Sequence, residues 1–176
     1  MNWTELLTRE MTATYQTTDK MLALLKDADL NWKPATGDNW MTVGQLLAHI
    51  NGSCGACCQG FVTGDWGLPE GDCDGDAGGH EPMMPTAEQM ATVESVAAAR
   101  AGFAADRKVA FQMLEKAGAE NLATLKSAAP WEPDNPLILG HHLLHMVNHL
   151  AIHKAQLFYY LKLMGRKVDT MTLWGM

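Results

Sequence analysis

The segment from residue 137 to residue 164 constrains the fold more than any other part of the sequence, because its apolar residues recur at a helical spacing. They follow an i, i+4, i+7 rhythm: Leu143, Val147, Leu150, Leu157, Leu161 and Met164. Gly165 comes directly after the last of them and can supply a left-handed C-cap. The pattern predicts one long amphipathic helix that buries one face against other elements.

Three further stretches carry helical signals, and they should span about residues 2–29, 43–62 and 86–118. Residues suited to capping precede each apolar run: Asn2 with Glu5, Thr42 with Gln45, and Thr86 with Gln89. Residues 119–136 give no clear signal, and no run of alternating apolar residues predicts a strand. The sequence therefore predicts four helices and no sheet.

Residues 64–85, between the second and third predicted helices, are rich in glycine, proline and acidic side chains and have no sustained period. We predict a long irregular loop there. The chain has 176 residues, of which 47% are hydrophobic, and this length suits a single domain over residues 1–176. The predicted fold class is all-α, a four-helix bundle with one long loop.

Charge and composition limit the classes of partner. The formal net charge is −7, and no basic stripe could neutralise phosphates or anionic lipid, so we expect neither a nucleic acid nor a membrane partner. Glu5 and Glu10 lie where a secretory signal would need an apolar stretch, and no window approaches the roughly 18 apolar residues of a membrane span. We expect a soluble, cytoplasmic protein.

The long C-terminal helix carries five histidines: His141, His142, His145, His149 and His153. Residues four apart on a helix lie on one face, with Cβ atoms within roughly 6 Å, so an i, i+4 pair can chelate a metal ion. His149 and His153 share a row that borders the apolar stripe, so their rings should point into a partly buried groove. His49, in the second helix, could supply the third ligand.

A simpler interpretation exists for each histidine taken alone. A single histidine among apolar neighbours is more often a hydrogen-bonded core residue than a ligand, and the others could be surface residues. Taken together, His49, His149 and His153 favour a site for one divalent ion. Three neutral imidazoles with an open position suit zinc, nickel or iron, and the sequence does not choose among these metals.

Two other groups resemble chemical sites but have simpler explanations. Cys54, Cys57 and Cys58 lack a second C-x-x-C to complete a four-sulfur zinc site and lack a nearby cation, so we expect buried thiols packed between helices. The acidic run at residues 72–76 fails as a calcium loop because the required glycine and glutamate positions hold other residues.

Some side chains could lie near a metal site without binding the ion. His80, in the predicted loop, reaches the site only if the loop folds over the groove. Trp40 and Trp174 are the tryptophans that we place nearest to a site. Gln156 and Tyr160 follow His153 by one and two turns, so they could orient a substrate or donate a proton.

Two segments carry a specific resemblance to a known family. Residues 32–50 contain W-x-P followed by W-M-T-V-G-Q-L-L-A-H-I, and residues 145–165 read H-M-V-N-H-L-A-I-H-K-A-Q-L-F-Y-Y-L-K-L-M-G. With T-L-W-G at residues 172–175, these segments resemble the DinB-like (YfiT-like) metalloenzyme family. Lys154 follows His153 where relatives often show a second histidine and then arginine, which is one departure from the family pattern.

The resemblance implies a four-helix bundle, frequently a homodimer, with one divalent metal ion. In the family the ion sits on one histidine of the second helix and an H-x-x-x-H pair of the last, which correspond to His49, His149 and His153. Some relatives are thiol-dependent transferases or isomerases. We therefore expect a metal-dependent enzyme of the thiol-transferase or hydrolase kind that acts on a small molecule, with a low-molecular-weight thiol as a further candidate partner.

Two alternatives from other classes stay open at this stage. One is a non-catalytic module whose ion is structural and holds the second and fourth helices together. The other is a dimeric stress or detoxification protein that binds a ligand without converting it, with the 64–85 loop as a lid. The catalytic residues, the metal and the substrate cannot be read from the sequence.

Overall fold

The structure is a computed structural model that describes residues 2–66 and 86–176, and most of these residues are helical. The N-terminal part contains α1 (Trp3–Leu22), the short 3₁₀ helix η1 (Asp27–Asp29), α2 (Val43–Ile50) and α3 (Gly55–Thr63). After the undescribed residues come η2 (Ala87–Gln89), α4 (Val96–Thr124), β1 (Lys126–Ala129), β2 (Glu132–Ile138), α5 (Leu139–Leu163) and α6 (Thr170–Trp174).

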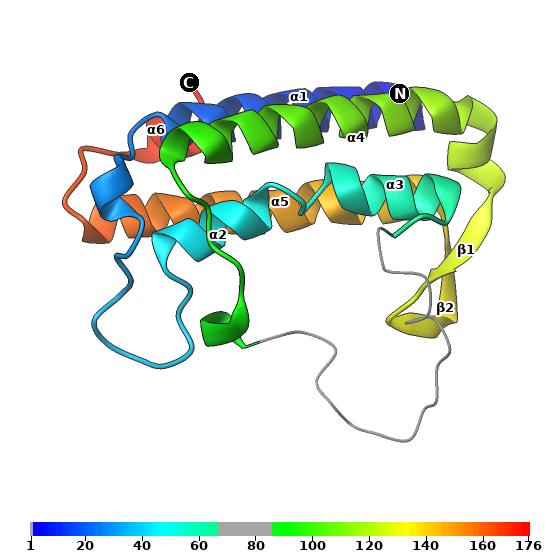
Figure 1. Cartoon of the computed structure of the whole chain (residues 1–176). Coiled ribbons are helices and arrows are strands. Elements are labelled where there is room, and N and C mark those ends of the chain that lie inside the picture. Colours follow the sequence, from blue (N-terminus) through cyan, green and yellow to red (C-terminus); the bar gives the residue numbers. More distant parts are fainter. Residues whose placement is uncertain (1, 67–85) are drawn as a thin grey trace, which may run out of the picture.

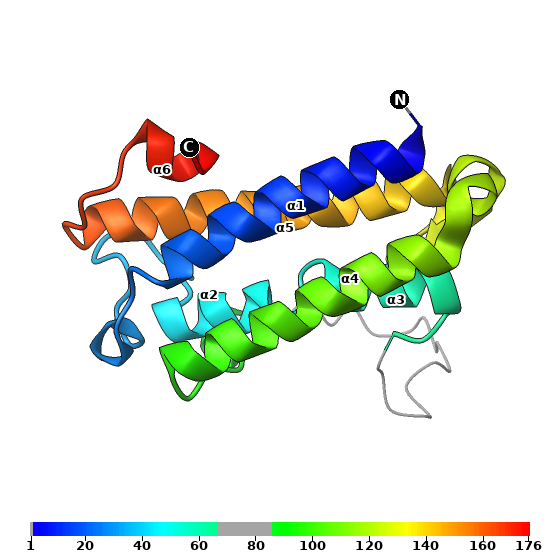
Figure 2. The same ribbon diagram turned by 90° about the horizontal axis from the view of Figure 1, so that it is seen from above.

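The helices form two layers (Figure 1). α1 and α4 lie side by side in one layer, and α5 lies in the other with α2 and α3. Seen from above, α4 runs along both α2 and α3, which follow one another in nearly one line, while α1 crosses α5 (Figure 2). Both α2 and α3 also contact α5, so this pair of short helices packs against both α4 and α5.

α5 confirms the predicted C-terminal helix almost to the residue. Five residues of the predicted apolar stripe are buried in the core, and Met164 is partly buried against it; the five are Leu143, Val147, Leu150, Leu157 and Leu161. The helix ends as predicted, because Gly165 follows its C-cap residue with φ +76°, a backbone conformation that suits glycine. The stripe packs against α1, α2, α3 and α4, so α5 holds the other helices together.

The predicted second helix is interrupted, and this break has consequences for the site. α2 begins at the predicted capping box, in which Gln45 N donates to Thr42 Oγ1 and Thr42 N donates to Gln45 Oε1. It stops at Ile50, and after a turn α3 starts at Gly55. A carboxylate from α4 stabilises the new start, because Asp106 accepts hydrogen bonds from the N–H groups of Gly55 and Ala56.

The first and third predicted helices have different bounds in the structure. α1 has the predicted N-cap, in which Asn2 accepts from Glu5 N, but it ends at Leu22, and η1 forms separately before residue 30. The predicted start at Thr86 is wrong, because residues 87–89 form only one 3₁₀ turn. α4 begins at Val96, where Ser95 accepts from Ala98 N, and continues past Gly118 through a kink with φ +69°.

A two-stranded hairpin departs from the purely helical prediction. β1 and β2 pair antiparallel, with Lys126 opposite Ile138 and Ser127 opposite Leu137. Most β2 residues are exposed, so the hairpin rests on backbone pairing and does not need the alternating apolar pattern that marks a half-buried strand. The sequence signal was absent for this reason.

Two further expectations concern the loop and membranes. The predicted 64–85 loop falls mostly outside the described residues, and so do His80 and the acidic run at 72–76. Across the helices of the described ranges, none combines the length and the apolar character that crossing a membrane would require.

Candidate metal centre

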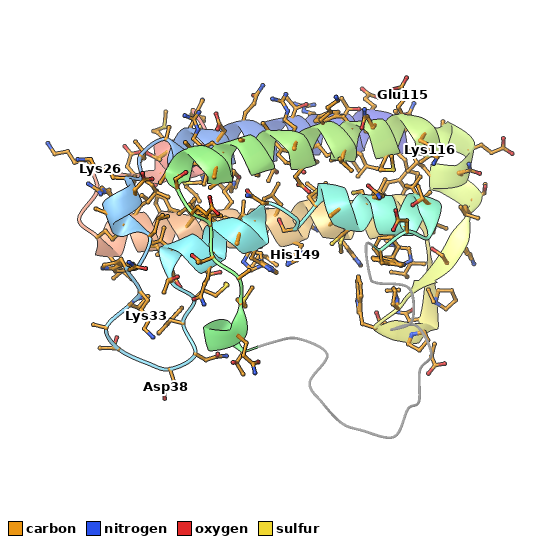
Figure 3. All side chains as sticks on the ribbon, in the orientation of Figure 1. Lys26, Lys33, Asp38, Glu115, Lys116 and His149 are labelled. Carbon is orange, nitrogen blue, oxygen red and sulfur yellow. The ribbon has the colours of Figure 1, made fainter. Side chains whose placement is uncertain are left out.

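Three histidines from two helices converge between α2 and α5. His49 lies in the last turn of α2, and His149 and His153 lie one turn apart on α5. One ligand atom from each ring lies within 4.8 Å of the others, and all three side chains are partly buried. Figure 3 labels His149 beside the junction of α2 and α3. The three residues singled out in the sequence are therefore brought together.

A backbone carbonyl fixes the orientation of the His149 ring. The Nδ1 atom of His149 lies 3.0 Å from the carbonyl oxygen of Ser53. A carbonyl oxygen can only accept a hydrogen bond, so Nδ1 carries the proton and donates it. The other ring nitrogen, Nε2, then has a free lone pair that points toward His49. The carbonyl is available because the chain leaves the helical path between α2 and α3.

A chain of side chains fixes the His153 ring in the same way. Tyr160 donates its hydroxyl proton to the carbonyl oxygen of Met41 at 2.9 Å. The Tyr160 oxygen accepts from the amide nitrogen of Gln156 at 3.3 Å, so the amide oxygen of Gln156 faces His153 at 3.0 Å. That oxygen only accepts, which places the proton on Nδ1 of His153 and leaves Nε2 unprotonated.

The distance between one pair of ring nitrogens is close to the spacing in a metal site, and all three ligand atoms lie within 4.8 Å of one another. Nε2 of His49 lies 3.1 Å from Nε2 of His149. Two lone pairs at this distance repel each other unless a proton or a cation lies between them. Two nitrogens that share a tetrahedral zinc ion, each about 2.0–2.1 Å from it, lie roughly 3.3 Å apart. In His149 and His153 the other ring nitrogen, Nδ1, is held by a hydrogen bond. Imidazoles that bind metal ions are usually oriented by such a second hydrogen bond.

The site also keeps the imidazoles neutral, as metal ligands must be. Burial, with smaller contributions from His153 and His149, lowers the pKa of His49 to about 4. Burial also lowers the pKa of His149 and of His153, although the hydrogen bonds to Ser53 and Gln156 oppose that effect. At neutral pH all three rings are uncharged and can donate a lone pair.

A small cavity adjoins His49, one of the three histidines. A cavity of about 210 Å³ is lined by Ala48, His49, Gln89, Met90 and Ala91. Gln45 anchors this wall, because its amide nitrogen donates to the carbonyl oxygens of Ala87 and Met90. No charged side chain lines this cavity in the part of the chain that the structure describes.

The other histidines of α5 lie away from the cluster. His142 is buried, stacks on Phe61 and makes a hydrogen bond with the carbonyl of Ser127, so it anchors the hairpin. His141 and His145 are exposed and stack on each other. Within the described ranges, no histidine, cysteine or acidic side chain apart from the three forms such a cluster.

The cysteines behave as predicted. Cys54 and Cys58 are buried, and Cys57 is partly buried. Burial raises the pKa of Cys57 to about 11, and a hydrogen bond with Cys54 together with burial raises the pKa of Cys58. Thiols with a raised pKa are poor nucleophiles and poor metal ligands at neutral pH, which agrees with a packing role.

Two of the predicted neighbours of the site take defined positions. Trp40 packs edge-on against Tyr160, which belongs to the hydrogen-bond chain from His153. Trp174 lies under the Lys154 ammonium group and is largely exposed. Tyr160 is not a free proton donor, because its hydroxyl proton is held by the carbonyl of Met41.

Sequence reasoning missed the role of Ser53. Its contribution comes from a backbone carbonyl, so its side chain carries no signal. The neighbouring Asn51 and Gly52 form an Asn-Gly pair, which often marks a turn and could have indicated the break between α2 and α3. Gln156 was a candidate for orienting a substrate, and the structure shows that it orients His153.

Comparisons with known proteins agree with this description. A DinB-like protein from Bacillus cereus ATCC 10987 has a similar crystal structure, with a TM-score of 0.67 and 19% sequence identity over 94% of this chain and 95% of that chain. No curated protein matches the chain. The family model described as the DinB superfamily matches residues 10–157, a stretch that includes all three histidines. The chain therefore belongs to the DinB superfamily.

Proposed function

We propose that this protein binds one divalent metal ion on His49, His149 and His153 and uses it as an enzyme acting on a small molecule. The observation that carries the proposal is the pair of hydrogen bonds that leaves Nε2 of His149 and of His153 unprotonated and aimed at one region. Histidines that only fill a core do not need both rings held in this tautomer. Membership of the DinB superfamily supports the same conclusion.

The residues of the chain would hold the ion and leave part of its surface open. Among residues 2–66 and 86–176, no fourth histidine, cysteine or acidic side chain joins the three histidines in the cluster. A catalytic site differs from a structural one in keeping such an open position. The ion would supply Lewis acidity, which lowers the pKa of a water molecule or a thiol that it binds. Neutral ligands preserve that acidity because they leave the charge of the ion uncompensated.

The reaction class we propose is transfer of a low-molecular-weight thiol to an electrophile, or hydrolysis. The cavity beside His49 has no charged lining among the described residues, which favours an uncharged electrophile. Its wall of Ala48, Met90 and Ala91 would exclude water from one side of the substrate. Because no acidic side chain lies in the cluster, the proton from the attacking group would pass to solvent or to a base on the substrate.

We further infer the family architecture for the whole chain. α2 and α3 together would form the second helix of a four-helix bundle, interrupted at the turn that exposes the Ser53 carbonyl. A homodimer is the assembly expected from the family. Three apolar side chains on the outer face of α5 support this expectation, because Ile152, Tyr159 and Leu163 are each more than half exposed.

The experiment that tests the proposal counts metal in the purified, untagged protein. Zinc, nickel and iron are measured per chain after dialysis, for the wild type, His149→Ala and the control His145→Ala. About one ion per chain in the wild type and the control, with loss in His149→Ala, would support the site. An equal content in all three would refute it.

Activity screening then separates the enzyme from the two alternatives. The metal-loaded protein is incubated with a small thiol and an epoxide or alkyl halide, and separately with activated esters and amides. Product formation that disappears in His149→Ala supports the enzyme. Binding without product would favour a ligand-binding protein, and metal whose removal only unfolds the chain would favour a structural ion.

A further inference from the structure

The turn between α2 and α3 links the candidate metal centre to a buried carboxylate on α4. Residues 51–54 form this turn, and the Ser53 carbonyl on one side of it accepts from the ring of His149. On the other side, Asp106 accepts hydrogen bonds from Gly55 N and Ala56 N, each at 3.0 Å. The turn therefore contacts α5 through the Ser53 carbonyl, and the start of α3 directly after it contacts α4 through two amides.

Asp106 is an unusual group for a helical core. Its side chain is only 5% exposed, and it accepts a third hydrogen bond, at 2.6 Å, from the hydroxyl of Tyr15 on α1. Burying a carboxylate costs free energy unless hydrogen bonds compensate it. The three donors and the positive end of the α3 dipole offset part of this cost, although burial still raises the pKa of Asp106 above its ordinary value. The carboxylate also replaces a local cap, since the N-cap residue Cys54 makes no side-chain capping bond.

Two glycines allow α4 to lie against both ends of the turn. A Cβ atom on Gly55 would collide with the backbone carbonyl of Asp106, and one on Gly102 would collide with the amide of Asn51. Gly102 and Asp106 are four residues apart on α4 and so lie on one face of that helix. Close contact at Asn51 and at Gly55 holds the turn, with Ser53 between them, in a fixed place.

We propose that Asp106 is a positioning residue for the metal ligand His149, acting through the turn at 51–54 and the carbonyl of Ser53. Tyr15 supports it by holding the carboxylate. The inference rests on the proposed metal site but names a part of the molecule that touches neither the ion nor a substrate. Without the carboxylate, the first turn of α3 loses its cap, and the Ser53 carbonyl is no longer held at a hydrogen-bonding distance from Nδ1 of His149.

The test compares Asp106→Asn and Tyr15→Phe with the wild type and with Asp29→Asn. Asp29 makes a partly buried ion pair with Arg166 and takes no part in the turn, so its variant controls for lost stability alone. Cobalt(II) is titrated into the metal-free proteins, and affinity and the visible absorption bands are recorded. In parallel, the Nδ1–H resonance of His149 is followed by NMR in the metal-free state, where no ion contributes.

The expected result is cobalt affinity about tenfold lower in Asp106→Asn, at the lower end of effects from groups behind a ligand, with altered absorption bands. The His149 Nδ1–H resonance should shift or exchange faster with water. Tyr15→Phe should show smaller changes in the same direction. If Asp106→Asn does not fold, the affinity and the His149 resonance of Tyr15→Phe test the inference instead. Asp29→Asn should match the wild type in affinity and spectra.

Three results would overturn the inference. The first is a folded Asp106→Asn protein with unchanged cobalt affinity and an unchanged His149 resonance. This result would refute the positioning role of Asp106 but not the metal site. Equal losses in Asp29→Asn would mean that general destabilisation explains the effect. A wild-type chain that binds no cobalt would refute the proposed function and this inference with it. That outcome differs from unchanged affinity in Asp106→Asn, which refutes the inference alone.

Discussion

The side-chain oxygen of Gln156 lies 3.0 Å from Nδ1 of His153 and so determines which ring nitrogen of His153 faces the candidate metal centre. Gln156 is itself held, because its amide nitrogen donates to Tyr160, whose hydroxyl donates to the Met41 carbonyl. The tautomer of this candidate ligand thus depends on a backbone carbonyl that is 119 residues from Tyr160 along the chain.

Replacing Gln156 should therefore weaken metal binding without removing a ligand. In Gln156→Ala, Nδ1 of His153 loses its acceptor and the ring can rotate, so we expect affinity about 10- to 100-fold lower. Competition with a chelator of known affinity measures the change. The control is Gln112→Ala, an exposed position on α4. Equal affinities in the two variants would show that Gln156 does not orient the ligand.

The three histidines should be required individually. His49→Ala, His149→Ala and His153→Ala should each reduce the bound metal from about one ion per chain to near zero after dialysis, because two imidazoles hold a divalent ion too weakly. His141→Ala should retain the ion, since its side chain is exposed and packs beside Trp3. Metal content measured per chain decides this, and retention in any one of the first three variants would remove that residue from the ligand set.

The sequence was sufficient to predict α5 and the clustering of His49, His149 and His153 for a common reason. A helix that is long and regularly patterned depends on local spacing, so the burial of Leu143 and Leu150 and the shared face of His149 and His153 could be inferred from position alone. The pairing with His49 required only that α2 pack its apolar face on α5, which its pattern also indicated.

The features that the sequence did not reveal depend on contacts between distant residues. The apolar pattern over residues 43–62 is compatible with one helix, and the break is stabilised by Asp106, which is 51 residues from Gly55 along the chain. A capping box at Thr86 similarly failed to start a long helix, because Gln45 and Asn39 anchor that segment to the first half of the chain. Local signals cannot report such contacts.

Stability of the metal-free protein should depend on pH through the histidines. Burial lowers the pKa of His49 to about 4, so between that value and the ordinary 6.5 the unfolded chain binds more protons than the folded one. The free energy of unfolding should then rise with pH across this window, reach its full value above it, and fall as the pH drops toward about 4. His149 and His153, whose pKa values are also lowered, should add to the effect.

Urea unfolding of the metal-free chain at several pH values between about 4.5 and about 7.5 measures this dependence. His49→Gln lacks one titrating group, so its free energy of unfolding should change less over the same range. If the wild type and His49→Gln lose stability in parallel, the burial of His49 is not the cause of the acid sensitivity.

The variant His142→Ala should lose stability, because His142 supports the fold and is not one of the candidate metal ligands on α5. Its side chain is 3% exposed, its Nε2 atom lies 2.7 Å from the Ser127 carbonyl oxygen, and its ring stacks on Phe61 at 4.2 Å between centroids. Removing the ring in His142→Ala leaves a cavity and an unpaired carbonyl, so we expect a loss of about 2–4 kcal/mol in the free energy of unfolding.

The same variant should keep its metal, because His142 anchors the hairpin and lies outside the cluster of His49, His149 and His153. His145→Ala is the matched control: its exposed ring should change stability by no more than about 0.5 kcal/mol, also with the metal retained. Urea unfolding and metal content, measured on the same samples, give both quantities. A folded His142→Ala protein that lost its ion would contradict the assignment of His142 as a structural residue. It would show that this histidine contributes to metal binding as well as to the fold.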